Sequence, residues 1–433
     1  MNIENLKEFL SSIGATEFLF KKLSDNDNCK QQIYLGGSYD ALTELPHGDI
    51  YVEQGVKKPT FKASVKLSWL SDNGTLEPAP NAKFILYPKY PEVRLSGFLS
   101  NCKSAPSQYL QPKTKEQRTG GQDGRVLILC PIKDEVIAYL AIPGSSLSNY
   151  FMEKECSSFL GKEYIVKEID TKKTLINVLR KTYLSNPHEL VRLLPNGELI
   201  PYTKRNAAGY TLEAKFGIIP NGSPEPDFMG WELKCVKENR VTLMTPQPDG
   251  GVYQRIGNKE FVLKYGHSSQ DGGMYFTGPY TTIPDKDTGR RLIVEGFERA
   301  NDKGTSRIVD SEGSISLIEG DEILASWSFS HILSHWCNKH NKACYVKYKY
   351  ETDYFSDKKM ISFLNKVKLC EGTSPVKLIE AVYDSSVYLD PGSRVKENGE
   401  SKARNQFRIA LDKLNCLYDF LEDVDLDETT EES

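Results

Sequence analysis

Two acids followed by a lysine form the pattern in this chain with the clearest chemical meaning. In EPDFMGWELKCV, Asp227 precedes Glu232 by five residues, and Lys234 follows that glutamate by two. Residues i and i+2 of a β-strand share a face, so Glu232 and Lys234 point the same way if this segment is a strand. Pro226 and Gly230 mark a turn that can bring Asp227 back beside them.

These side chains suit the hydrolysis of a phosphodiester. Two converging carboxylates bind a hard divalent cation such as Mg²⁺, and a neighbouring ammonium can hold or deprotonate a water molecule aimed at phosphorus. The spacing alone also fits a solvated strand whose acids and lysine form salt bridges, because charged residues alternate on many exposed strands. Apolar Leu233 and Cys235, with Phe228 and Trp231 close by, indicate a strand that is half buried.

A third carboxylate lies upstream of this segment. Glu213 falls in GYTLEAKFGI, an amphipathic pattern that predicts a helix, and the turn IIPNGSPEP connects that helix to the strand. From the helix, Glu213 could reach the same cation or its waters. A glutamate that faces solvent is an equally open alternative.

A second group of possible metal ligands lies further along the chain. Five histidines and cysteines fall within 14 residues: His331, His335, Cys337, His340 and Cys344. Two histidines at i and i+4 of a helix can bind zinc, but the spacing matches no closed tetrahedral site, so packing in a core is the preferred interpretation. A groove-facing role for Lys339 or His340 is the next alternative. Trp327 and Trp336 are expected in the core.

The composition is that of a globular protein rather than a disordered or fibrous one. The 433 residues are 39% hydrophobic and 26% charged, with 32 glycines and 22 prolines scattered through a mixed sequence. This length suits two or three domains. The formal net charge is −4, but the segment from Asp419 to Ser433 holds eight acids and no base. The rest of the chain is therefore mildly basic, which leaves nucleic acid open as a partner.

The sequence carries no signal for export or membrane insertion. No run of 18 apolar residues occurs, and the start, MNIENLKEFLSSIG, is amphipathic and lacks the basic and apolar segments of a secretory signal. We therefore expect a cytoplasmic protein without membrane contact. The nine cysteines, spread from Cys29 to Cys416 without a CxxC pair, predict reduced thiols.

The order of predicted elements divides the chain in two. Residues 17–142 are almost wholly period-two strands, with a turn at Lys133 and Asp134, which predicts a barrel or sandwich. The basic, glutamine-rich stretch 103–124 fits a phosphate-contacting arm or an ordinary surface loop. Small polar residues at 143–151 mark a boundary. Helices and strands alternate from Asn206, including a helix expected over 323–340, which predicts an α/β or α+β core.

The second half resembles a known family of DNA-cutting enzymes. The similar segments are AGYTLEAKFGI, PNGSPEPDFMGWELKCV, RVTLMTPQPDGGVY, the tryptophan helix and KHNKACYVKY. Over residues 160–415 the chain is similar to the MvaI/BcnI family of restriction endonucleases, relatives of the mismatch-repair nickase MutH. The PD-(D/E)xK nuclease motif of that family falls on Pro226, Asp227, Glu232 and Lys234.

This resemblance implies a role for each site residue. Asp227, Glu232 and the main-chain carbonyl of Leu233 would ligate Mg²⁺. Lys234 would orient the attacking water, Glu213 would hold a water molecule or a second ion, and in-line attack would leave 5′-phosphate and 3′-hydroxyl ends. The family also implies a monomer that cuts a pseudo-palindromic site one strand at a time, with CCWGG as the expected target.

Residues 1 to about 145 resemble the effector DNA-binding domain of EcoRII-type endonucleases, a B3-like pseudobarrel. The similarity rests on EFLFKKLSDNDN, QIYLGGSYDAL, KFILYP with EVRLSG, and the two strands after GGQDGR. Two arms of that fold grip the major groove, and Lys, Arg, Asn and Glu side chains suit base edges. Their counterparts here would be Lys22, Ser24, Asn26 and Asp27 on the first arm, and Tyr90, Glu92, Arg94 and Ser96 on the second.

The predicted fold is an N-terminal all-β B3-like pseudobarrel followed by a C-terminal α/β PD-(D/E)xK restriction-endonuclease-like domain. The expected boundaries are 1–145 for the effector domain, 146–160 for a linker, 161–418 for the catalytic domain and 419–433 for an acidic disordered tail. The arrangement is similar to UbaLAI-like type IIE enzymes and predicts Mg²⁺-dependent cleavage of double-stranded DNA, with a cognate site in each domain. The alternative is a DNA-binding regulator with an inactive nuclease module, against which the intact Asp227, Glu232 and Lys234 argue.

Overall fold

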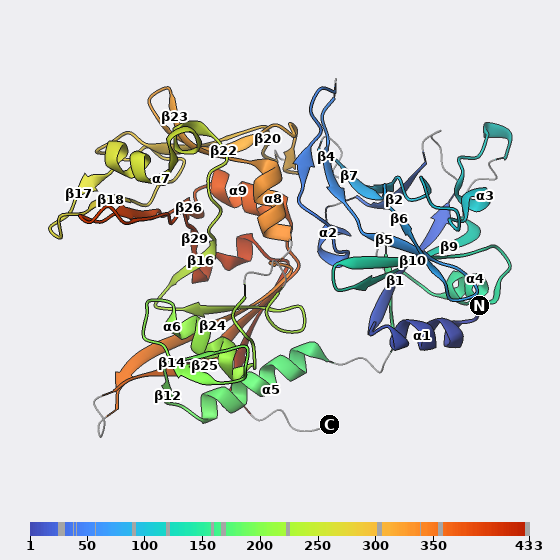
Figure 1. The fold of residues 1–433 in the computed structure, drawn as a ribbon, viewed down its shortest axis with the longest axis horizontal. Helices are drawn as coiled ribbons and strands as arrows, with labels where there is room; N and C mark the ends of the chain where they lie inside the picture. The colour runs from blue at the N-terminus through green and yellow to red at the C-terminus, as the bar shows by residue number, and fades with distance from the viewer. Residues whose placement is uncertain are drawn as a thin grey trace. The chain divides into compact units, whose positions relative to one another are not determined.

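The computed structural model divides the chain into two compact units, Met1–Ile169 (unit 1) and Asp170–Ser433 (unit 2). It describes residues 1–24, 31–37, 39, 41–56, 58–88, 92–117, 122–156, 160–165, 170–221, 226–300, 305–337, 339–353 and 358–428 (Figure 1). In these residues no helix is long and apolar enough to cross a membrane. The eight cysteines that the structure describes form no disulfide bonds with one another.

Unit 1 consists of two β-sheets and short helices, which confirms the all-β prediction. One sheet has the order β11 (Gly161–Tyr164), β1 (Glu17–Ser24), β9 (Gln122–Ile132), β10 (Glu135–Ala141), β5 (Leu67–Leu70) and β6 (Leu76–Ala79). The other has the order β2 (Gln32–Gly36), β8 (Glu92–Ser96), β7 (Lys83–Tyr87), β4 (Phe61–Ser64) and β3 (Tyr51–Val52). The helices are α1 (Ile3–Ser12), α2 (Ala41–Glu44), α3 (Ser107–Leu110), α4 (Ser146–Glu153) and the 3-10 turn η1 (Lys115–Gln117). The B3 assignment itself stays a prediction.

The core of unit 1 follows from alternation along its strands. Phe18 and Phe20, two residues apart on β1, are both buried, and they pack with Val126 and Ile128 of β9. The predicted turn between β9 and β10 is present, with Lys133 at a φ of 53°. Within the stretch 103–124, α3 and η1 form short helical turns, so only part of it is the irregular loop that its composition indicates.

The predicted linker 146–160 is wrong for its first half. Ser145 caps the N-terminus of α4 by accepting a hydrogen bond from the Ser148 amide, and Phe151 of this helix packs against Phe18 and Phe20. Strand β11 then pairs with β1. The chain therefore leaves unit 1 at residue 169, more than twenty residues after the boundary expected from composition.

Unit 2 contains a central sheet that carries the predicted catalytic motif. Strand β24 (Lys342–Thr352) lies between β15 (Glu232–Val236) and β25 (Lys359–Glu371), parallel to the first and antiparallel to the second. Strands β12 (His188–Glu189) and β30 (Phe420–Asp425) pair with β25. Helices α5 (Thr171–Leu184) and α6 (Ala207–Lys215) bury Leu175, Leu179 and Leu212 in the same core as Leu233. This packing holds β15 in place.

The remainder of unit 2 contains smaller sheets. They are β16 (Arg240–Met244) with β29 (Phe407–Ala410) and β26 (Val387–Leu389), and β17 (His267–Ser268) with β18 (Met274–Thr277), β27 (Gly392–Val395) and β28 (Ser401–Lys402). The others are β19 (Arg291–Glu295) with β22 (Ser314–Glu319) and β23 (Glu322–Ser328), β13 (Val191–Leu193) with β14 (Leu199–Pro201), and β20 (Phe297–Glu298) with β21 (Arg307–Ile308). Helices α7 (Gly251–Tyr265), α8 (Phe329–Cys337), α9 (Pro375–Tyr383) and the 3-10 helix η2 (Leu411–Cys416) complete it.

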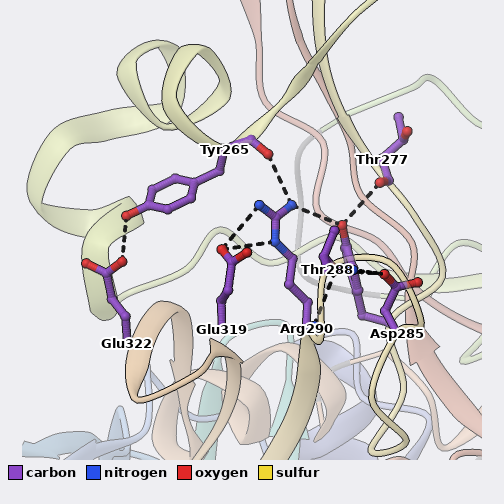
Figure 2. Close-up of polar contacts among 8 residues, drawn as sticks. Tyr265, Thr277, Asp285, Thr288, Arg290, Glu319 and Glu322 are labelled. Carbon is purple, nitrogen blue, oxygen red and sulfur yellow. Dashed lines mark hydrogen bonds and ion pairs between the residues drawn. The ribbon is translucent and has the colours of Figure 1, made fainter.

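A buried arginine ties three of these elements together (Figure 2). The guanidinium of Arg290, 9% exposed, donates to Glu319 on β22 and to the carbonyl of Tyr265 at the end of α7. It also donates to the hydroxyl of Tyr280, which donates to the carbonyl of Thr277 on β18. If β18 moved, polar groups of this network would be left buried without partners, which costs free energy. The network therefore holds β18 in position.

Two predicted segments differ from the structure. The helix expected over 323–340 begins only at Phe329, because residues 322–328 pair with β22 as strand β23. The acidic tail expected to be disordered from residue 419 instead forms β30 over Phe420–Asp425. The ammonium of Lys368 pairs with Asp423 at 2.6 Å, and Lys172 pairs with Glu422. These two lysines offset the negative charge of the β30 carboxylates. A count of acids in this segment alone does not reveal these partners.

Candidate active site

A tight turn brings Asp227 to the start of β15. Phe228 and Trp231 hydrogen bond to each other through both main-chain amides, at 2.9 and 2.8 Å, and Met229 and Gly230 between them have positive φ angles. Trp231 is fully buried and anchors the turn. The carboxylate of Asp227 accepts a hydrogen bond of 2.8 Å from the Leu233 amide. The predicted return of Asp227 toward the strand is thus present.

Glu232 and Lys234 lie on the same face of β15, as the strand period requires. The Lys234 ammonium donates to Glu232 Oε1 at 2.7 Å. Glu232 is only 5% exposed, and its second oxygen, Oε2, is buried without a hydrogen-bond partner. A buried carboxylate oxygen with no donor is costly, so a ligand that supplies positive charge would stabilise this arrangement.

Glu213 faces these two carboxylates from helix α6. The helix is held against β15 by the Cys235 thiol, which donates to the Ala208 carbonyl at 3.3 Å. Burial, followed by repulsion from Asp227 and Glu232, raises the pKa of Glu213 to about 7. Burial and the charge of Glu232 also raise the pKa of Asp227. Three carboxylates therefore repel one another at the start of this strand.

Two lysines partly offset this repulsion. Lys234 and Lys339 both lower the pKa values of Glu213 and Asp227 by their charge, although burial and the neighbouring carboxylates outweigh them. Lys339 follows helix α8, which places a residue from the histidine-rich segment within electrostatic range of the acidic cluster. The groove-facing alternative for Lys339 stays a prediction.

The acidic cluster fits one divalent cation better than a closed metal cage. In the part of the chain that the structure describes, no three His, Cys, Asp or Glu side chains are arranged to hold a metal ion. Mg²⁺ commonly takes one or two carboxylates and keeps several waters, so the unpartnered Oε2 of Glu232 with Asp227 suits it. The Leu233 carbonyl as a further ligand stays a prediction.

A family model for the MvaI/BcnI restriction endonuclease family matches residues 187–418, more than half of the chain. The chain belongs to the MvaI/BcnI restriction endonuclease family. The sequence resemblance to this family is thereby confirmed for unit 2.

Solved structures and curated proteins give further comparisons. The restriction endonuclease MvaI in complex with its cognate DNA substrate is 14% identical, with a TM-score of 0.45, over 59% of this chain and 99% of its own. MvaI in the absence of DNA is 13% identical, with a TM-score of 0.31, over 60% of this chain and 99% of its own. No curated protein matches the chain.

In this family member, Cys337, His340 and Cys344 pack in the core, whereas His331 is partly exposed and His335 is exposed. The His340 ring stacks on Trp336 at 4.1 Å, and burial, then the charges of Lys234 and Lys339, lowers its pKa well below the ordinary value. Cys337 and Cys344 are buried, and the rings of His331 and His335 lie 4.7 Å apart. Trp327 and Trp336 are fully buried, as predicted. These contacts agree with packing rather than a zinc site.

A basic surface near β27 and β29 was missed by the sequence reasoning. Arg394, Arg404 and Arg408 line a cavity of about 420 Å³ together with Asp390. Arg408 pairs with Asp390 at 2.7 Å, and Arg240 lies 3.8 Å from the same carboxylate. The segment RNQFR, with arginines four residues apart beside an extended run, could have indicated this surface.

In unit 1 the two predicted DNA-binding arms differ. The Lys22 ammonium donates to the carbonyls of Met152 and Lys154 at the end of α4, so it stabilises that helix end instead of facing outward. The Ser24 carbonyl accepts from Arg125 at 3.4 Å. Asn26, Asp27 and Tyr90 lie outside the described residues.

The second predicted arm of unit 1 has one partly exposed, polar face on strand β8. Glu92, Arg94 and Ser96 alternate along β8 and are each partly exposed. Arg94 pairs with Glu92 at 2.8 Å and lies over the ring of Tyr87 at 5.2 Å. Gln32 of β2 accepts from Arg94 and from the Tyr87 hydroxyl, both at 3.3 Å. Gln32 is therefore an additional polar residue on this face.

Proposed function

We propose that this protein is a type II restriction endonuclease, of the type IIE kind, that hydrolyses double-stranded DNA at a short specific sequence with Mg²⁺. The observation that carries the proposal is the convergence of Asp227, Glu232 and Lys234, with one oxygen of Glu232 buried and unpartnered. Family membership supports the same reaction class.

Each residue of the acidic cluster takes one part of the reaction. Asp227 and Glu232 would hold Mg²⁺, which supplies Lewis-acid stabilisation of the phosphate charge when bound. Lys234, already placed 2.7 Å from Glu232, is positioned to orient a water molecule and to stabilise negative charge on the phosphate. Glu213, with a pKa near 7, can accept a proton from a water molecule at neutral pH.

The cavity around Asp390 suits the reading of a C·G base pair. Arginine binds guanine through two hydrogen bonds, and a carboxylate accepts from the amino group of cytosine. Asp390 and Arg408 lie 2.7 Å apart on neighbouring segments, so both could reach one base pair once DNA separates them. This chemistry agrees with the expected target CCWGG, which contains only C·G pairs outside its centre.

Unit 1 would act as the effector module. Glu92 and Arg94 on β8 would contact a second copy of the site, and binding there would alter cleavage by unit 2. One catalytic cluster per chain serves one strand at a time, so a monomer would produce nicked DNA before linear DNA.

Supercoiled plasmid tests the catalytic proposal directly. The wild-type protein with Mg²⁺ should give open-circular and then linear DNA, and EDTA should stop the reaction. Asp227→Asn should abolish cleavage while leaving DNA binding, because phosphate contacts lie elsewhere. Asp321→Asn, an exposed aspartate in the turn between β22 and β23, is the matched control. Cleavage by Asp227→Asn at the wild-type rate would remove this cluster from contention.

A further inference from the structure

A second basic cavity, of about 460 Å³, adjoins the strand of the catalytic motif. Cys235 of β15 lines it, together with Tyr348 and Tyr350 of β24. Consecutive residues of a strand point to opposite faces, so Cys235 and this cavity lie on the side of β15 opposite Lys234. None of Glu213, Asp227, Glu232 and Lys234 lines this cavity.

Positive charge dominates the lining of this cavity. Seven of its lining side chains are basic, and Glu238 is the single acid among them. Lys237 lies 3.9 Å from Glu238, which offsets one of these charges. Lys204 and Arg205 enter from the segment before α6, and Lys359 lies over the ring of Tyr350 at 3.7 Å. The lining thus carries a large excess of cations.

These cations lack sufficient partners within the protein. Among the described residues, Arg205 and Arg404 form no ion pair. Burial, then the charges of Arg205 and Arg408, lowers the pKa of Arg404, and Arg408 Nε is buried without a hydrogen-bond partner. Clustered cations that repel one another destabilise the free protein, and a bound anion would relieve this repulsion.

We propose that this cavity binds a phosphate of the DNA backbone away from the bond that is cut, an inference that rests on the proposed nuclease function. The cavity shares Arg205, Arg240, Arg404 and Arg408 with the cavity around Asp390. A base pair read in the cavity around Asp390 would bring the DNA backbone close to this adjoining cavity, so a backbone phosphate fits it better than a free anion. Such contacts set the position of the duplex and carry no sequence information.

The salt dependence of DNA binding tests this assignment in the full-length protein. Lys204→Gln and Lys359→Gln are compared with Lys349→Gln, which lies on β24 between the two tyrosines and faces the other way. A short fluorescent duplex is titrated at several salt concentrations, with Ca²⁺ in place of Mg²⁺. Each cavity variant should lower the slope of log affinity against log salt by about 1 and weaken cognate and scrambled duplexes equally. Lys349→Gln should leave the slope unchanged.

Three results would overturn the proposal. The first is an unchanged slope in both cavity variants, or an equal change in Lys349→Gln. The second is a loss confined to the cognate duplex, the pattern expected of Asp390→Asn, because it would assign the cavity to base reading. The third is competition by inorganic phosphate beyond that of chloride at equal ionic strength, seen in the wild type and lost in the variants, because it would assign the cavity to a free anion.

Plasmid cleavage by the same preparations separates this proposal from the proposed function. If the wild-type protein cuts specifically but both cavity variants show the wild-type salt slope, only the proposed backbone-phosphate site is contradicted. If the variants show the expected change in salt slope but the wild-type protein does not cut DNA, only the proposed nuclease function is contradicted. Lys204 and Lys359 are exposed, so thermal unfolding of both variants should match the wild type.

Discussion

Two regions of unit 2 each gather like charges beside strand β15, one an acidic side and the other a basic side. On the first side, Glu213 and Asp227 have raised pKa values because they are buried and lie close to Glu232. On the other, Arg404 has a lowered pKa because it is buried and lies close to Arg205 and Arg408. Each region is strained in the free protein, and each would be relieved by a ligand of the opposite sign. The signs differ because one side would receive a cation and the other the backbone of the substrate.

In this protein, the two proposed ligand sites are places where like charges repel one another without enough partners of opposite sign. By contrast, the buried charge of Arg290 is matched, because its guanidinium donates to Glu319, to the Tyr265 carbonyl and to the Tyr280 hydroxyl (Figure 2). Asp123 of unit 1 is likewise surrounded by Lys113 and Arg125. Matched networks stabilise the fold, whereas the two unmatched regions are available for ligands.

The largest expected effect is the loss of catalysis on the acidic side. Lys234→Ala should reduce plasmid cleavage by at least about 10³-fold while cognate DNA binding stays close to that of the wild type, because the lysine acts on the water and the phosphate charge. Lys366→Ala, an exposed lysine of β25 in the same sheet, should cut normally. A Lys234→Ala protein that loses binding and cleavage in equal measure would break the division between an acidic catalytic side and a basic binding side.

A smaller effect is expected in unit 1, where the charge of Arg94 is balanced by an ion pair with Glu92. Because of this ion pair, Arg94 should contribute to DNA binding by unit 1 through specific contacts with the bases rather than through its positive charge alone. Arg94→Ala should remove the response of cleavage to a second site, an effect of roughly 5 to 150-fold if the coupling is about 1–3 kcal/mol. One-site and two-site plasmids, with and without an added cognate oligonucleotide, measure it. Lys103→Ala, exposed in the same unit, should keep the response. Unchanged rates in Arg94→Ala would contradict the effector role.

The smallest effect concerns stability. The pKa of Glu213 rises from 4.5 to about 7, so the folded state holds this proton more tightly than the unfolded state. The contribution to stability is therefore greatest below about pH 4.5 and falls as the pH rises toward 7. In EDTA, Glu213→Gln should be more stable than the wild type at pH 8, by about 1–2 kcal/mol or a few degrees in Tm. Thermal unfolding between pH 5 and 8 checks this. Parallel curves for the two proteins would show that the carboxylates do not repel as described.

The strand motif was predictable because it depends on short-range geometry. The distance of two residues between Glu232 and Lys234 places them on one face in any strand, and Pro226 with Gly230 marked the turn beside them. The prediction that Glu213 lies near this strand depended only on a helix that leads into the strand. These features are set by the local chain, so a single sequence was sufficient to predict them.

The features that were missed depend on contacts between distant segments. Arg205, Arg240 and Arg408 meet in one cavity although about 200 residues separate the first from the last. The resemblance predicts a DNA contact for Lys22, but its partners are carbonyls at the C-terminal end of α4, about 130 residues away. Strand β30 pairs with β25, and its acids meet Lys368 and Lys172, which no local count of charges could reveal. Charge and composition alone cannot show which residues become neighbours.

Strand β30 also has a consequence for how this protein behaves at high concentration. Among the described strands it pairs only with β25, so its other edge offers main-chain groups to any extended segment of another chain. Phe420, the first residue of β30, is 72% exposed and would favour such association. The carboxylates of Glu422, Asp423 and Asp425 oppose it, because two such edges would repel each other. The acids of β30 therefore oppose association between two copies of this protein through the exposed edge of the strand.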